Sequence, residues 1–203
     1  MHNINNVEKL YNDATHLYKD LVVNGESGAD AILYKLVEAI ENLKTNWKGA
    51  DAGLWIQNAI EVHNAMVSVR NALAELASNA VMTAVMYRNI HIANKVSSSE
   101  LQALNYDVKG MINSYMDNAD RVYVSPEVKN GQTNIDLALK MLENFTNQVK
   151  YIYDEIMDNW TQGPKRDSAN EAFVTFLSSV GKYREKLENV SLNITTALNN
   201  YGV

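Results

Sequence analysis

One uninterrupted stretch limits what this chain can fold into. No glycine or proline occurs between Leu54 and Val96. Apolar residues recur there at alternating steps of three and four, which places them on one face of an α-helix. They are Trp55, Ala59, Val62, Met66, Val69, Leu73, Leu76, Ala80, Tyr87 and Ile90. A helix of about 40 residues is ~60 Å long, and a stripe of this length predicts antiparallel partner helices in a bundle or short coiled coil.

The same spacing predicts helices along most of the remaining chain. Only two prolines and nine glycines interrupt its 203 residues, and no segment shows the alternation expected of a strand. Loops are expected around Asn24-Gly25, at Gly49, over 95–100 and over 124–134. The expected helices cover residues 4–22, 29–46, 51–95, 100–122, 134–159 and 164–201. The predicted fold class is all-α: two antiparallel helical hairpins with additional helices, similar to a four-helix bundle and elongated.

A tryptophan followed closely by a glycine marks the turn of each predicted hairpin. The first corner is Trp47-Lys48-Gly49, and the second is Trp160-Thr161-Gln162-Gly163. Glycine takes positive φ at the lowest cost. A tryptophan in the last helical turn can bury its ring while its N–H reaches a free carbonyl. The chain therefore divides into a first hairpin repeat, 1–97, and a second, divergent repeat, 98–203. Both corners are also candidate recognition surfaces.

Composition argues against several functions. The net charge of −6 disfavours a nucleic-acid surface. No cysteine is present, so disulfides and thiolate metal sites are excluded. No apolar run approaches the roughly 20 residues of a membrane span, and the first 20 residues do not resemble a signal peptide. Histidines stand alone at 2, 16, 63 and 91, without the spacing of a zinc or di-iron site. We expect no catalytic residues, no metal and no cofactor, hence a non-enzymatic protein.

Residues 28–95 are predicted to form two helices joined by Trp47-Lys48-Gly49. This arrangement resembles the WXG family, which are small helical-hairpin proteins of bacterial type VII secretion. Residues 133–201 resemble a divergent copy. Family members pair as antiparallel hairpins into a four-helix bundle, so a tandem chain could supply both hairpins itself. The resemblance implies protein partners, in the secretion machinery or another hairpin protein. It also implies secretion without a cleavable signal peptide, from a cytoplasmic pool. The alternative is a cytosolic or phage-associated helical adaptor that is not exported.

The resemblance also implies an export signal, Tyr-x-x-x-Asp/Glu, directly after the second helix of a hairpin. In the first repeat the nearest match is Tyr87 with His91, where histidine replaces the acid. In the second repeat only two residues follow Tyr201. Both are therefore candidates for a degenerate signal. Because the 51–95 helix is longer than the 29–46 helix that should cover it, we expect an elongated particle that forms a homodimer. The alternative is a monomer in which the helices of one chain cover each other's apolar faces.

Overall fold

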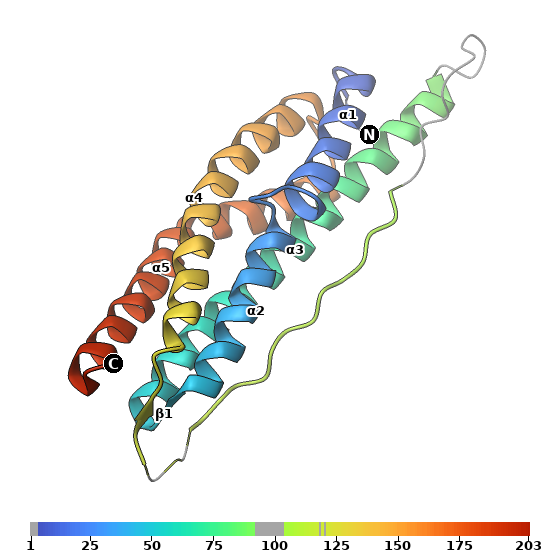
Figure 1. Cartoon of the computed structure of the whole chain (residues 1–203). Helices are drawn as coiled ribbons and strands as arrows, with labels where there is room; N and C mark the ends of the chain where they lie inside the picture. Colours follow the sequence, from blue (N-terminus) through green and yellow to red (C-terminus); the bar gives the residue numbers. More distant parts are fainter. Residues whose placement is uncertain (1–3, 92–103, 118, 120) are drawn as a thin grey trace.

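A computed structural model describes residues 4–91, 104–117, 119 and 121–203, and it is all-α and elongated (Figure 1). Two-residue strands form a small antiparallel pair beside the first corner. The fold class predicted from the sequence is therefore confirmed. The elements are α1 (Val7–His16), the π-helical segment η1 (Leu17–Val23), α2 (Ala29–Asn46), β1 (Trp47–Lys48), α3 (Ala50–His91), β2 (Tyr123–Val124), α4 (Val128–Asn159) and α5 (Pro164–Tyr201).

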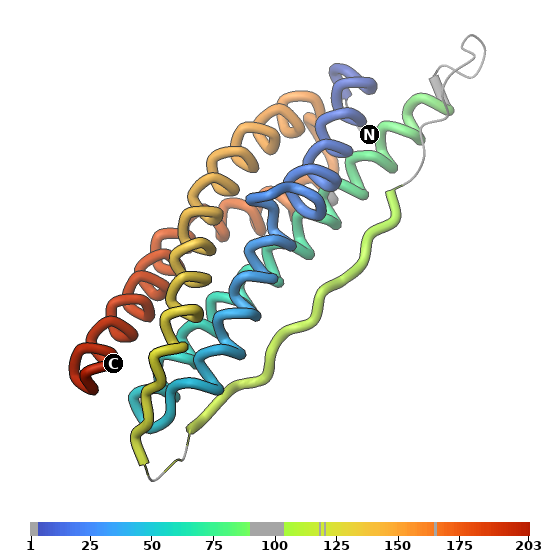
Figure 2. The backbone as a smooth tube through the Cα atoms, viewed as in Figure 1, coloured from blue at the N-terminus to red at the C-terminus, as the bar shows by residue number. Residues whose placement is uncertain are grey.

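Four helices form the bundle. The hairpin α2–α3 and the hairpin α4–α5 pack together so that α2 contacts α4 and α3 contacts α5. Each helix runs antiparallel to both of its neighbours, as the colour gradient along the chain shows (Figure 2). Neither hairpin has a core of its own, because the apolar faces of both meet in one continuous cluster. The two repeats are thus halves of a single bundle.

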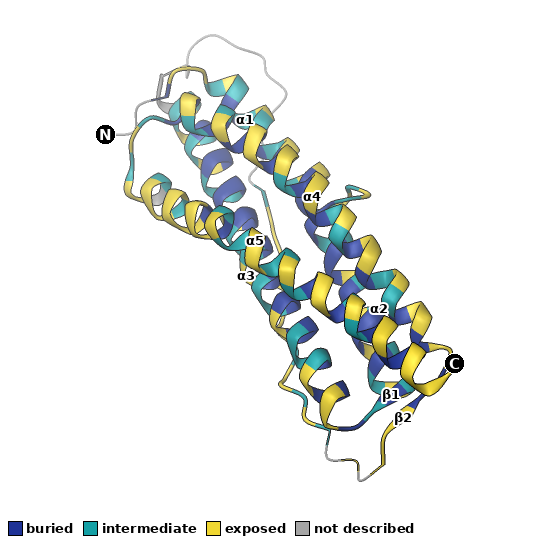
Figure 3. Ribbon diagram, turned by 90° about the vertical axis from the view of Figure 1, so that its left-hand side faces the viewer, coloured by how far each residue is buried: buried dark blue, intermediate teal, exposed yellow. Residues whose placement is uncertain are grey.

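The long helix α3 is covered over most of its length within one chain. α1 and η1 lie end to end with α2, and all three pack against α3. Its core positions are buried from Ala52 to Ala84, which is visible as the dark inner faces of the bundle in Figure 3. We expected a homodimer because the apolar seam of α3 would otherwise lie in water. The chain covers that seam itself from Ala52 to Ala84, so the seam gives no reason for a dimer, and the homodimer stays a prediction.

One expected helix, 100–122, is wrong. Residues 104–117 are extended and run along the outside of the bundle (Figure 2). The apolar residues that suggested a helical face are largely in water: Val108 is 71% exposed and Met111 is 63% exposed. Gly110 also lowers the helix propensity of this segment. The repeat boundary predicted within 95–100 lies outside the described residues.

The loop expected over 124–134 is also mostly wrong, because α4 already begins at Val128. Gly131 lies inside this helix at a close approach to α2, where an added Cβ would be 2.9 Å from a Leu43 methyl carbon. Its N–H donates to the Asn42 side chain (3.0 Å). The glycine therefore marks helix packing, not a turn. Inside this helix, the Thr133 hydroxyl donates to the Lys129 carbonyl.

Candidate functional site: the first corner and its groove

The first corner has the geometry expected from its sequence. α2 ends at Asn46, and Trp47 takes an extended conformation (φ −136°, ψ 121°) while its N–H still bonds to the Leu43 carbonyl. Gly49 has φ +117°, a value that side-chain-bearing residues rarely adopt. The Trp47 side chain is only 3% exposed and belongs to the core. The tryptophan thus fixes the end of α2 to the bundle, and the glycine allows the reversal into α3.

The second corner repeats this plan at the end of α4. Trp160 is fully buried, Gly163 has φ +146°, and Pro164 opens α5. The Arg166 guanidinium donates to the Trp160 carbonyl. One expectation fails: the indole N–H of Trp160 is buried and has no acceptor among the described residues. Among the described residues, the Trp160 ring therefore contributes by burial.

Each corner is paired with a segment that precedes a helix in the other half of the chain. At the first corner, Trp47 is the antiparallel partner of Val124, which precedes α4. At the second corner, Trp160 forms an antiparallel bridge with Ile4, which precedes α1. The corners lie at opposite ends of the bundle (Figure 1). Each half thus contributes a short backbone pairing to the corner of the other half, which no feature of the sequence pattern alone indicated.

A groove of about 630 Å³ opens at the first corner, between the start of α3 and the last turns of α5. Trp47, Gly49 and Tyr201 all line it, so the structure brings together three of the residues singled out from the sequence. Figure 3 shows the C-terminus beside β1 at this end. Leu54, which is 56% exposed, adds an apolar wall. The groove offers apolar and amide surface, which suits binding of a protein segment.

The other candidate residues lie apart from this groove. Trp160 and Gly163 are at the opposite end of the bundle. Tyr87 is half-buried within α3, and the side chain of His91 lies outside the described residues. Tyr201 is the last residue of α5, which Gly202 ends in the left-handed conformation (φ +67°). The Tyr87–His91 match is therefore helical and does not follow the helix, unlike the family's signal.

Sequence reasoning missed a row of amides on α3, at Gln57, Asn64 and Asn71, that binds the extended segment 104–117. We call this segment the strap. Asn64 exchanges two hydrogen bonds of 2.8 Å with the backbone of Ile112, and Gln57 accepts from the Tyr115 N–H (2.9 Å). Seven-residue spacing of amides on the polar face of α3 was the signal that could have revealed it.

A charge network around the buried Arg70 joins the strap to the bundle. Arg70 on α3 is fully buried and donates to Asp30 at the start of α2 (Nε–Oδ1 2.9 Å) and to Asp107 of the strap (Nη2–Oδ1 2.6 Å). Hydrogen bonds from Lys109 and Arg70 lower the pKa of Asp107 to about 2. Nearby on α3, burial lowers the pKa of His63, whose ring nitrogen lies 3.0 Å from the Asn64 side-chain oxygen.

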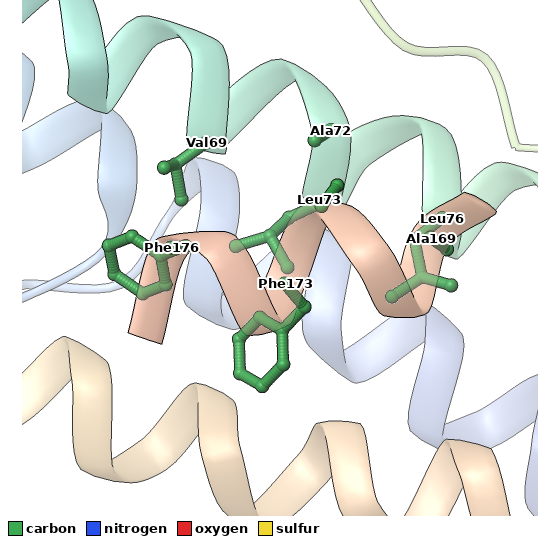
Figure 4. A pocket seen from close by; sticks show the side chains of 8 residues that line it. Val69, Ala72, Leu73, Leu76, Ala169, Phe173 and Phe176 are labelled. Atoms are coloured by element: carbon green, nitrogen blue, oxygen red, sulfur yellow. The ribbon is translucent and has the colours of Figure 1, made fainter. Parts of the chain in front are cut away.

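A second hollow, between α3 and α5, is a packing defect and not a site. Leu73 and Leu76 of α3 face Phe173 and Phe176 of α5 across it (Figure 4). Its volume is about 10 Å³, room for one water at most, and its lining is apolar. In the part of the chain that the structure describes, no three histidine or acidic side chains gather as a metal site would require.

No family model matches the chain, and the comparisons with curated proteins and with solved structures found no significant match either. None of the described helices combines the length and the hydropathy needed to cross a bilayer.

Proposed function

We propose that this chain is a fused pair of WXG-type hairpins, a non-enzymatic protein of a bacterial type VII secretion system that acts by binding protein partners. One observation carries the proposal: two Trp–Gly corners lie at opposite ends of one antiparallel four-helix bundle. The reciprocal pairing of Trp47 with Val124 and of Trp160 with Ile4 supports it. This is the arrangement that two separate hairpins of the family would form as a pair.

The groove at the first corner is the proposed contact with the secretion machinery. It places the first hairpin's corner beside Tyr201, the end of the second hairpin. Residues from both repeats thus form one surface, which a single hairpin lacks. Its exposed apolar side chains, Leu54 and Tyr201 (51% exposed), are available to a partner.

Export by the source bacterium tests this function. The protein is followed in cell and culture fractions with and without the secretion ATPase, with a cytosolic enzyme as lysis control. We expect export that depends on the ATPase. Tyr201→Ala should reduce it, whereas Tyr151→Ala should leave it unchanged; Tyr151 is the matched control because it is also exposed (65%) and lies on α4. Retention in the cell in both strains would refute export.

A non-exported adaptor is the second candidate. It is favoured by the position of Tyr87, inside α3 instead of after it, and by histidine at the acid position of that motif. Under this alternative the first-corner groove binds a cytosolic or phage protein, and the ATPase has no effect on where the chain accumulates.

A further inference from the structure

The strap is held through its backbone. Asn71 accepts from the Lys109 N–H and donates to the Lys109 carbonyl, both at 3.0 Å. Asn64 makes the same double contact with Ile112, and Gln57 accepts from the N–H of Tyr115. Each contact is made to atoms that every residue except proline carries. The amide row therefore binds an extended chain with little regard to its side chains.

The two spacings match. Gln57, Asn64 and Asn71 follow one another at seven residues, which is ~10.5 Å along an α-helix. Their partners Tyr115, Ile112 and Lys109 follow at three residues, which is ~9–10 Å along an extended chain. Helix and strap therefore stay in register over three successive contacts, antiparallel to each other, as a dedicated binding surface would.

Two aspartates fix the register at the ends of the strap. Asp107 receives two hydrogen bonds from the buried Arg70, one through its side chain and one through its carbonyl. Asp117 accepts from the Gly49 N–H (2.9 Å), where a carboxylate is favourable to the start of α3. Nine residues separate the two aspartates. The surface thus requires an acidic side chain at each end of an extended segment.

Of the apolar side chains between the aspartates, three lie largely in water and two pack against the bundle. Val108, Met111 and Met116 are 71%, 63% and 78% exposed, whereas Ile112 and Tyr115 are partly buried against the core. An added Cβ at Gly110 would meet nothing within 4 Å. Most polar contacts of the strap are thus made by its backbone and its two carboxylates, while Ile112 and Tyr115 add apolar contact.

From this arrangement we propose that the amide row, together with Arg70 and the Gly49 N–H, is a peptide-binding surface that the strap occupies in cis. It binds in trans an extended partner segment with two aspartates separated by nine residues. This goes beyond the proposed role in secretion and does not depend on it. A tethered segment competes at an effective concentration in the millimolar range, so a partner peptide binds only when the strap is weakened or displaced.

The test uses the full-length protein and a fluorescent peptide of residues 104–117, followed by anisotropy. Lys109→Pro with Ile112→Pro removes the two strap N–H groups that Asn71 and Asn64 bind, and leaves α3 unchanged. We expect this variant to bind the peptide at least tenfold more tightly than the wild type. The matched control is Val108→Pro with Met111→Pro, whose N–H groups make no hydrogen bond among the described residues, and it should bind like the wild type.

Two further arms make the result specific. Asn64→Ala with Asn71→Ala, added to the Lys109→Pro/Ile112→Pro variant, should abolish the gain, and so should a peptide with both aspartates changed to asparagine. Circular dichroism shows whether each variant keeps its helical content. Equal peptide affinity in wild type and proline variant, or a gain that persists without the two asparagines, would overturn the proposal. Formation of a dimer through exchanged straps, without peptide uptake, would overturn it as well.

Discussion

Replacing Trp47 by alanine should remove a large buried side chain from the first corner. The side chain is 97% buried, given its 3% exposure, and a buried tryptophan removes about 150–250 Å² from water. At about 25 cal/mol per Å², this corresponds to roughly 4–6 kcal/mol of transfer free energy. Alanine retains part of the contact, and observed costs of Trp→Ala in cores are about 3–5 kcal/mol. We expect a loss of that size in the free energy of unfolding.

Urea denaturation followed by far-ultraviolet circular dichroism measures this loss. Trp55→Ala is the matched control, because Trp55 lines the groove and is only half-buried. We expect it to cost less than Trp47→Ala, because more of the Trp55 side chain already lies in water. A loss below about 1 kcal/mol for Trp47→Ala would show that the ring is not part of the core. Equal losses for both tryptophans would refute the assigned difference in burial.

Four further variants test individual features. Trp160→Phe should change the free energy of unfolding by less than about 1 kcal/mol in urea, because losing a buried N–H without an acceptor offsets the lost volume. Gly49→Ala should lower the free energy of unfolding by about 1–3 kcal/mol because alanine is strained at a φ of +117°. Gly181→Ala, where an added Cβ meets open space on α5, should raise it by about 0.5–1 kcal/mol. Calorimetry compares the two variants. The pKa of Asp107 is about 2 when folded against an ordinary 3.8, so its contribution is present above pH 4 and lost as pH falls toward 2. Asp107→Asn should lack this part of the acid unfolding profile.

The helices and corners could be predicted because local rules determine them. In α3 the apolar spacing, the absence of breakers and the burial all agree. Trp47 and Gly49 are fixed by the geometry of an αα-turn. The groove depends on the pairing of the hairpins. That Tyr201 lines the groove follows only from the structure, in which α5 ends beside the first corner.

The strap could not be predicted, because its conformation is determined by α3 and not by its own residues. Its apolar residues follow the spacing of a helix, yet Val108 and Met111 face water. What holds it extended is a set of side-chain amides more than 35 residues away. The start of α4 was missed for a similar reason. In the sequence Gly131 suggests a turn, but in the structure it lies inside α4 where α2 leaves no room for a side chain.

The central claim is that one chain supplies both hairpins with their corners at opposite ends, and a distance between the corners tests it most directly. The absence of cysteine allows clean spin labelling at two introduced sites. Asp51→Cys and Gln162→Cys, both exposed, flank the two corners. α4 separates these corners by 32 residues, so double electron–electron resonance should give about 50 Å. Asp51→Cys with Tyr201→Cys, both on the groove, should give a far shorter distance. A short distance between the labels at 51 and 162 would place both corners at one end and contradict the fused-pair account.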